Sequence, residues 1–298
     1  MTNSESSIAL IGPGAVGGII AAALVSHGGH DLTLCARRPV GALSVELLDG
    51  VVSLAPKVLT DPTQGRPVDW VLVATKAYDA AGAAAWFPGL VGPSTRVAIL
   101  QNGVEHRERF AAYLDAAQIL PVMVDIPAER PSPGRIVQRG AGKMIVPEGA
   151  DGTRFVELFA GTSLAVTATA DFTSAVWRKL CLNSIGAFNA LLLKPAGVFR
   201  DEAIGRLALA MARECVLVGR AEGAVLEDTL PETILAHSRQ APSDSVNSLH
   251  ADRAAGRPME VDARNGAIVR FGRRHGIPTP CNEMAATLLA ALLLPASR

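Results

Sequence analysis

Hydrophobic residues in the first half of the chain fall into short runs, and these runs alternate with stretches of helical character. The apolar runs cover residues 7–11, 31–35, 70–74, 96–100 and 119–124. An alanine-rich stretch that follows the first run predicts a helix over residues 15–26. Near-continuous apolar strands separated by helices are typical of a parallel sheet that is covered on both faces. We therefore expect an α/β fold in this half.

The pattern changes twice further along the chain. Residues 127–147 combine proline and glycine turns with short alternating stretches such as Arg135–Gln138. They predict antiparallel edge structure that closes the first domain. After Asp171, apolar residues recur at helical spacing toward the C-terminal end. We predict two domains, 1–170 and 171–298, of which the second is mostly α-helical.

Composition and charge narrow the classes of function. The chain has 298 residues, 28 Lys and Arg against 28 Asp and Glu, and 49% hydrophobic residues. Such a chain can bury a large core, and its balanced charge argues against nucleic acid as a partner. The segment from Ser6 to His30 contains no Asp, Glu, Lys or Arg, but Gly12-Pro13-Gly14 interrupts it. We therefore expect neither a membrane span nor a signal peptide.

The cysteines and histidines carry no recognisable site. Cys35, Cys181, Cys215 and Cys281 lie far apart, and the six histidines show no metal-ligand spacing. This predicts reduced thiols, a cytoplasmic location and no bound metal. Serine-hydrolase chemistry is excluded as well, because the sequence has no GxSxG elbow. The last helical stretch, Met284–Leu294, is expected either to pack as a terminal helix or to take part in a homodimer contact.

A glycine-rich segment lies between the first expected strand and the first expected helix. Its sequence, Gly12-Pro13-Gly14-Ala15-Val16-Gly17, fits the GxGxxG pattern. In this context the first glycine allows a tight turn, the second lets the backbone approach a pyrophosphate, and the third allows close helix–strand packing. The start of the helix adds unpaired N–H groups and a partial positive charge. A glycine-rich turn without a ligand is the plainer alternative; we predict a dinucleotide site in a Rossmann-type domain.

The end of the second expected strand indicates which dinucleotide is bound. NAD sites usually carry a carboxylate there, on the ribose 2′-hydroxyl, but this chain reads Cys35-Ala36-Arg37-Arg38. The guanidinium groups of Arg37 and Arg38 can instead form charge-assisted hydrogen bonds with a 2′-phosphate. The alternative is that the two arginines only flank a surface loop. We predict NADP as the cofactor.

Further polar clusters follow other expected strands and helices. Lys76 comes after the run at 70–74, and Gln101-Asn102-Gly103 comes after the run at 96–100. Both lie where the carboxyl ends of parallel strands bind ligands. On the first helix of the second half, Lys179 and Asn183 are one turn apart and share a face. By itself such a lysine is usually solvated, and Asn102 alone would indicate a turn.

A last group of motifs lies near the C-terminal end. It comprises Ser248-Leu249-His250-Ala251-Asp252, then Arg257 to Asp262 with Glu260 inside it, and Asn265-Gly266. Together with the glycine loop and the clusters around Lys76, Asn102 and Lys179, these motifs resemble the ketopantoate reductase (2-dehydropantoate 2-reductase) family. The resemblance spans nearly the whole chain, with the motifs in the same order.

The resemblance implies a fold, a reaction and roles for particular residues. The family reduces a 2-oxo acid to its 2-hydroxy acid with NADPH, in a cleft between a Rossmann domain and a helical domain. By this resemblance, Lys179 matches the family's general acid, and Glu260 matches a glutamate at the family's catalytic site. Hydride addition develops negative charge on oxygen, which an ammonium can both stabilise and protonate. The remaining matches place Lys76 and Asn102 at the cofactor, and Asn102, Asn183 and Ser248 at the substrate.

One departure from the family pattern bears on the substrate. The family helix carries a second asparagine at the position where this chain has Ala187. We therefore hypothesise a wider, more apolar pocket, and a paralogous reductase for another 2-oxo or 3-oxo acid stays open beside 2-dehydropantoate. A non-catalytic NADP-binding sensor is the second alternative. Retention of Lys179, Asn183, Ser248 and Glu260 argues against it, because nucleotide binding alone needs no proton donor.

Overall fold

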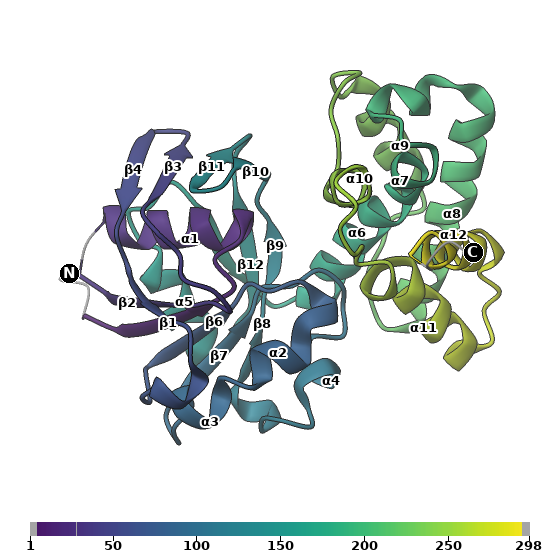
Figure 1. The fold of residues 1–298 in the computed structure, drawn as a ribbon. Helices are drawn as coiled ribbons and strands as arrows, with labels where there is room; N and C mark the ends of the chain where they lie inside the picture. The colour runs from purple at the N-terminus through teal and green to yellow at the C-terminus, as the bar shows by residue number, and fades with distance from the viewer. Residues whose placement is uncertain (1–4, 28, 294–298) are drawn as a thin grey trace, which may run out of the picture. The chain divides into compact units, whose positions relative to one another are not determined.

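The computed structural model describes residues 5–27 and 29–293, and the chain divides into two compact units (Figure 1). The first unit consists of Met1–Gln101 together with His106–Phe172. The second consists of Asn102–Glu105 together with Thr173–Arg298. The tetrapeptide Asn102–Glu105 thus belongs to the second unit, although it lies within the first in sequence.

The first unit is built on a six-stranded sheet with the order β5-β2-β1-β6-β7-β8. Its strands are β1 (Ser7–Ile11), β2 (Asp31–Cys35), β5 (Lys57–Leu59), β6 (Trp70–Val73), β7 (Arg96–Ile99) and β8 (Ile119–Pro121). Every neighbouring pair is parallel. With β5 as the third strand of the sheet, this is the doubly wound dinucleotide-binding order, and the chain reverses direction across the sheet between β1 and β6. The predicted Rossmann-type fold is confirmed.

Both faces of this sheet are covered, as the apolar runs predicted. In β1, Ile8 and Leu10 contribute to one hydrophobic cluster and Ala9 and Ile11 to the other. The second cluster includes residues of the helices that follow β6 and β7. The remaining helices of this unit are α2 (Ala80–Ala84), α3 (Phe87–Leu90), α4 (His106–Phe110) and α5 (Ala150–Leu158). The carboxyl ends of the central strands are left to present polar residues.

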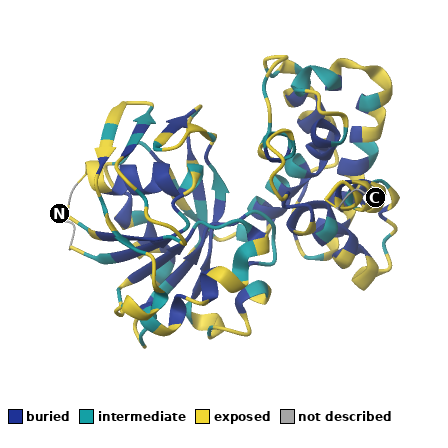
Figure 2. Cartoon of the chain, viewed as in Figure 1, coloured by how far each residue is buried: buried dark blue, intermediate teal, exposed yellow. Residues whose placement is uncertain are grey.

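Helix α1 (Ala15–Ser26) lies between the main sheet and a second sheet. Its residues from Gly17 to Leu24 are buried, which Figure 2 shows as a dark blue helix. Leu43 and Ile136, from the second sheet, share its hydrophobic cluster. A Cβ on Gly18 would lie 2.1 Å from Ile136 Cδ1, so the two elements touch closely. Burial on both sides explains why the segment around this helix carries no charge.

The antiparallel structure predicted at residues 127–147 is present, but two of its strands each also pair in parallel with another strand. The four-stranded sheet contains β3 (Leu43–Leu47), β4 (Gly50–Leu54), β10 (Ala128–Ser132) and β11 (Arg135–Gln138) in the order β10-β11-β3-β4. The three-stranded sheet contains β9 (Met123–Asp125), β12 (Lys143–Pro147) and β13 (Ala165–Thr169) in the order β13-β12-β9. The pairs β10–β11 and β9–β12 are antiparallel, whereas β12 pairs in parallel with β13. Strand β11 of the β10–β11 hairpin pairs in parallel with β3, far away in sequence, and apolar residues of both strands pack in one cluster with α1.

The apolar run at 119–124 also differs from a single strand. It divides at Val122 into β8, which closes the main sheet, and β9, which pairs with β12. The N–H of Val122 still donates to the carbonyl of Ile99, at 3.1 Å. The chain therefore leaves the main sheet immediately after its last ladder bond.

The second unit is built from helices joined by loops, and its described part contains no strand. Its helices are α6 (Phe172–Ile185, beginning one residue before the unit), α7 (Ala187–Leu192), α8 (Glu202–Ala221), α9 (Leu230–Gln240), α10 (Ser248–Ala254), α11 (Ala267–His275) and α12 (Pro280–Ala291). A single π-helical turn, Asp262–Gly266, precedes α11. Within residues 5–27 and 29–293, no helix is both long and apolar enough to cross a membrane.

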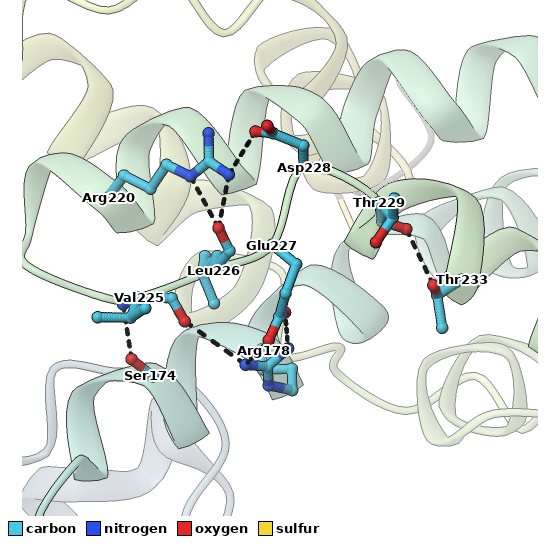
Figure 3. A network of polar contacts seen from close by, with 9 residues as sticks. All are labelled: Ser174, Arg178, Arg220, Val225, Leu226, Glu227, Asp228, Thr229 and Thr233. Atoms are coloured by element: carbon cyan, nitrogen blue, oxygen red, sulfur yellow. Dashed lines mark hydrogen bonds and ion pairs between the residues drawn. The ribbon is translucent and has the colours of Figure 1, made fainter.

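A polar network fixes one side of α6 (Figure 3). Ser174 accepts a hydrogen bond from the backbone N–H of Val225 at 2.7 Å, and Arg178 forms an ion pair with Glu227. From α8, Arg220 donates to the carbonyl of Leu226 at 3.0 Å. These bonds hold the segment that follows α8 against α6. Because Arg178 is committed to this side, the next residue, Lys179, projects from a different side of the helix.

Candidate active site

The glycine loop at the end of β1 has the geometry that a pyrophosphate site requires. Gly12 has φ +91°, and a Cβ on it would lie 2.8 Å from Thr75 Cγ2. A Cβ on Gly17 would lie only 2.3 Å from the Gly12 carbonyl oxygen. Only glycine fits these two positions, one because of its backbone conformation and the other because helix and turn touch.

Gly14 differs from its two neighbours in the motif. It is exposed, and a Cβ on it would meet no described atom within 4 Å. The fold therefore does not require glycine at this position, whereas a ligand lying against the backbone would. Gly14 is also the N-cap of α1, which has no side-chain cap and no acidic residue in its first turn. The N–H groups of Ala15, Val16 and Gly17 in that turn have no intrahelical acceptor, so the residues present fit a bound phosphate.

Arg37 and Arg38 lie in the loop that follows β2, and both are exposed. Arg37 Nη1 is 3.6 Å from Asp79 Oδ2, while the Arg37 side chain stays 84% exposed. Asp79 follows β6 in the chain, so this contact brings together the ends of two strands that flank β1. The position offers two exposed cations to a ligand phosphate, and the carboxylate of Asp79 lies close enough to compete for Arg37.

Lys76 lies in the loop after β6, and the side chain of Gln101 is hydrogen-bonded to this loop. Gln101 is 3% exposed and donates to Thr75 Oγ1 at 3.0 Å and to the Lys76 carbonyl at 3.3 Å. The backbone carbonyl oxygen of Gln101 is 2.9 Å from His106 Nε2. Burial lowers the pKa of His106 to about 4, so the ring is neutral and Nε2–H can donate. Sequence reasoning gave neither Gln101 nor His106 a role, although both frame the tetrapeptide Asn102–Glu105.

In the second unit, three of the predicted residues meet although they are distant in sequence. Asn102 Nδ2 donates to Glu260 Oε2 at 2.9 Å, and Asn183 Nδ2 donates to Asn102 Oδ1 at 3.4 Å. Glu260 is only 4% exposed, while the two asparagines are half-buried. Lys179, half-buried as well, lies one turn before Asn183 on α6. A carboxylate and two amides are thus joined by hydrogen bonds, and the amine of Lys179 shares a helix face with one of these amides.

The fifth predicted residue of this unit, Ser248, joins the group through Arg264, an arginine that the sequence analysis missed. Arg264 Nη2 donates to Ser248 Oγ at 2.7 Å. Arg264 lies on the π-helical turn that follows Glu260 and is 3% exposed. The sequence shows an arginine four residues after the motif glutamate, but it does not show that this arginine is buried. Such π-turns occur frequently at functional sites.

The structure does not support the hypothesis that Ala187 widens the substrate pocket. Ala187 begins α7 and has no exposed surface. Nearby, Asn189 accepts a hydrogen bond from Asn247 at 2.8 Å and donates to the Lys194 carbonyl at 3.0 Å. These side chains stabilise the turn after α7. Position 187 is therefore packed among protein atoms.

The described residues hold no metal-like cluster and no disulfide. No group of three or more His, Cys, Asp or Glu side chains among them could bind a metal ion. Each of the four cysteines is unpaired. Burial raises the pKa of Cys35 to about 12 and that of Cys281 to about 11. These thiols are therefore poor nucleophiles at neutral pH.

The fold and these two groups of residues define a nucleotide-binding α/β protein with a helical second unit. Residues 8–151 match the family described as ketopantoate reductase PanE/ApbA, and residues 171–293 match the C-terminal part of the same family. The chain belongs to the ketopantoate reductase family.

Individual relatives agree with this assignment. A 2-dehydropantoate 2-reductase of Caulobacter vibrioides is 53% identical over 97% of this chain and 100% of its own length. The enzyme of that name from Mycobacterium tuberculosis is 37% identical over 96% of this chain and 97% of its own. A ketopantoate reductase structure from Ralstonia eutropha has a TM-score of 0.87 at 30% identity, covering 96% of this chain and 98% of that one. A 2-dehydropantoate 2-reductase structure from Geobacter metallireducens has a TM-score of 0.89 at 26% identity, covering 96% and 99%.

Proposed function

We propose that this protein reduces 2-dehydropantoate to pantoate with NADPH, with Lys179 as the general acid. The observation that carries the proposal is the hydrogen-bonded series Asn183–Asn102–Glu260. Lys179 lies one turn before Asn183 on α6 and so shares its helix face. Three segments that are distant in sequence contribute to it, and nucleotide binding alone would not need it. The whole-chain likeness to 2-dehydropantoate 2-reductases supports the choice of substrate.

The glycine loop and the two arginines are assigned to the cofactor. The first-turn N–H groups of α1 would bind the pyrophosphate, and the open side of Gly14 admits its close approach. Arg37 and Arg38 would bind the 2′-phosphate, and Lys76 is assigned to the same cofactor. When bound, NADPH supplies the hydride. The first unit, up to about residue 170, is proposed as the NADP-binding domain.

The second unit is assigned to the substrate. A lysine side chain is ordinarily an ammonium at neutral pH, so Lys179 can donate a proton to the carbonyl oxygen as negative charge develops there. Asn183 and Asn102 can donate amide hydrogen bonds to the substrate, and Ser248 a hydroxyl. Glu260 holds Asn102 in one orientation, because its carboxylate accepts from Nδ2. This arrangement restricts the asparagine side chain before the substrate binds.

The experiment that tests the proposal is an NADPH-oxidation assay over a panel of 2-oxo acids that includes 2-dehydropantoate. We expect 2-dehydropantoate to give the highest kcat/KM. Lys179→Ala should lower kcat by about 10²–10⁴-fold, the usual contribution of a positioned proton donor. Arg178→Ala is the matched control, because this neighbour on α6 pairs with Glu227 and should leave kcat within about threefold. Undiminished turnover in Lys179→Ala would remove the lysine as the acid.

The same assay decides between the alternatives. Turnover of every panel member except 2-dehydropantoate would favour a paralogous reductase. No turnover at all, with NADPH still bound, would favour the sensor. Position 187 no longer favours the paralogue, because Ala187 is buried. A cytoplasmic location stays a prediction based on the reduced cysteines.

We also propose a homodimer as the form of the protein in solution. Met284, Leu288 and Leu292 recur at helical spacing on or just after α12, and each is close to half exposed. Residue 294, the end of the stretch predicted as a terminal or dimer helix, lies outside the described residues. Sedimentation analysis tests the proposal, since a monomer at micromolar concentration would contradict it.

A further inference from the structure

Arg264 is a buried arginine with incomplete hydrogen bonding. It is 3% exposed, and Nη2 donates to Ser248 Oγ at 2.7 Å. Its Nε is buried and has no hydrogen-bond partner among the described residues. A buried donor that lacks a partner costs free energy, so such a group requires an explanation beyond packing.

Two carboxylates, Glu260 and Asp252, stabilise the positive charge of this buried guanidinium. Burial lowers the pKa of Arg264, while the charges of Glu260 and Asp252 raise it. Asp252 is 5% exposed and also pairs with Arg257, at 2.9 Å. Since arginine stays protonated in proteins, a cation lies fixed between the glutamate of the proposed site and α10. An apolar side chain would fill the same space without the cost of burying a charge.

The arginine donates to the hydroxyl of an exposed residue. Ser248 is exposed, and its backbone begins α10, which Asn247 caps by accepting from the His250 N–H at 2.9 Å. The hydroxyl accepts from Arg264, so one lone pair is occupied and its own hydrogen is directed elsewhere. Because the donor is charged, the bond is of the strong, orienting kind. Ser248 is thereby prepared as a donor to an anion.

We propose that Arg264 is a positioning residue for the substrate carboxylate, which it serves by orienting and polarising Ser248. The inference rests on the proposed function, since it takes the anion to be the carboxylate of a 2-oxo acid. Arg264 itself does not touch the substrate. It fixes the hydroxyl that does, and it places positive charge behind that hydroxyl.

A double-mutant cycle tests this arrangement with 2-dehydropantoate. Ser248→Ala and Arg264→Met should each raise the KM for the 2-oxo acid by about tenfold, the usual effect of a hydrogen bond to a charged group. If the arginine acts through the serine, the double variant should be no more than about twofold worse than either single one. The KM for NADPH should not change, and kcat should stay within about threefold. A merely structural arginine would instead add its own effect to that of Ser248→Ala.

Two further variants complete the design. Arg264→Lys keeps the charge and one donor, and it should recover part of the lost KM. Arg253→Met is the matched control, since Arg253 donates to the Ala190 carbonyl and to the Leu191 carbonyl, the latter at 2.6 Å, and should affect stability without coupling to Ser248. If Arg264→Met does not fold, the cycle is decided with Arg264→Lys.

The outcomes separate the inference from the function on which it rests. Additive effects of the Ser248 and Arg264 variants, with the wild-type protein active, overturn the inference alone. A rise in the KM for NADPH equal to that for the 2-oxo acid does the same. Absence of NADPH oxidation by the wild-type protein overturns both. Non-additive effects confined to the KM of the 2-oxo acid support the role of Arg264.

Discussion

The glycine loop of the first unit and the polar cluster of the second are built in opposite ways. The loop consists of six consecutive residues, Gly12–Gly17, and in the proposed function it binds the cofactor through backbone N–H groups and open space. The cluster takes Asn102, Asn183, Glu260 and Ser248 from four segments, and in the proposed function it binds the substrate through side chains. In the loop, the proposed function depends on the absence of side chains at the glycines, which leaves the backbone open to a ligand. In the cluster it depends on which side chains hold one another.

This difference predicts how each region fails. An added methyl group in the loop has no polar partner to lose, and its effect is set by the space around it. A removed side chain in the cluster leaves a partner without its hydrogen bond, which costs about 1–3 kcal/mol when the partner is buried. The loop should therefore be sensitive to size, and the cluster to charge and hydrogen-bonding capacity.

The largest expected effect concerns the stability of the first unit. His106 is neutral there with a pKa of about 4, against 6.5 for an ordinary histidine, because it is buried. Between these two values the unfolded chain binds more protons than the folded one, so the free energy of unfolding falls as the pH is lowered from 6.5 to 4. The loss from this one group approaches about 3 kcal/mol. Urea unfolding at pH 7 and at pH 4.5 measures it.

His106→Gln should remove most of this pH dependence, because glutamine does not titrate. His237→Gln is the control, since His237 is exposed on α9 and should leave the wild-type dependence unchanged. An equal slope of stability against pH in His106→Gln and in the wild type would show that other groups cause the loss.

The next effect is expected in the cluster. Glu260→Gln keeps the size of the side chain but removes the charge that accepts from Asn102 and faces Arg264. Hydrogen bonds to charged groups contribute about 1.5–3 kcal/mol, so kcat/KM for the 2-oxo acid should fall by about 10–100-fold. The KM for NADPH should stay the same. Glu232→Gln, an exposed glutamate paired with Arg213 on the surface, should change neither value. A loss shared between substrate and cofactor would contradict the proposal that Glu260 acts on the substrate through Asn102, and would favour the predicted cofactor role of Asn102.

How far the sequence predicts these regions follows from the same contrast. The loop was recognisable because its glycines are consecutive and lie between a strand and a helix. The main sheet was recognisable because buried parallel strands are apolar throughout. The strands β3, β4 and β5 give no such signal, since each is only partly buried and none is a continuous apolar run. The pairing of β3 with the strand β11, some 90 residues away, depends on contacts that no local pattern records.

The cluster could be predicted only as a set of candidates. Spacing placed Lys179 and Asn183 on one face, because four residues make about one helical turn. It could not place Asn102 with Glu260, which are 158 residues apart in sequence. Nor could it distinguish the buried Arg264 from the exposed arginines near it. Long-range side-chain contacts follow from the packing of α6, α10 and the π-turn, which only the folded chain determines.

A matched pair of variants in the loop should separate folding from binding. Gly17→Ala places a Cβ 2.3 Å from the Gly12 carbonyl oxygen and should destabilise the protein by about 1–3 kcal/mol. Gly14→Ala meets no described atom within 4 Å, so its melting temperature should match the wild type while NADPH affinity falls about tenfold. Thermal unfolding and fluorescence titration with NADPH measure the two effects. If Gly14→Ala binds NADPH normally, the open space at this glycine is not a pyrophosphate site.

The smallest effect tests whether side chains contribute to the loop region at all. Asp79 lies 3.6 Å from Arg37, whose side chain is 84% exposed, so the pair is a weak surface contact. Asp79→Asn removes a carboxylate that competes with the 2′-phosphate for this arginine. NADPH affinity should rise about twofold, more at low salt than at high salt, because exposed charges are screened.

NADH provides the internal control for this variant, since it lacks the 2′-phosphate and its affinity should not change. Arg37→Ala should act in the opposite direction and weaken NADPH alone. Equal changes for both nucleotides would mean that Asp79 affects the loop as a whole, through the β6 end. A change confined to NADPH would mean that side chains next to the glycine loop determine which nucleotide binds there, just as side chains of the cluster are proposed to determine which substrate binds. The contrast between the two regions would then hold for binding but not for specificity.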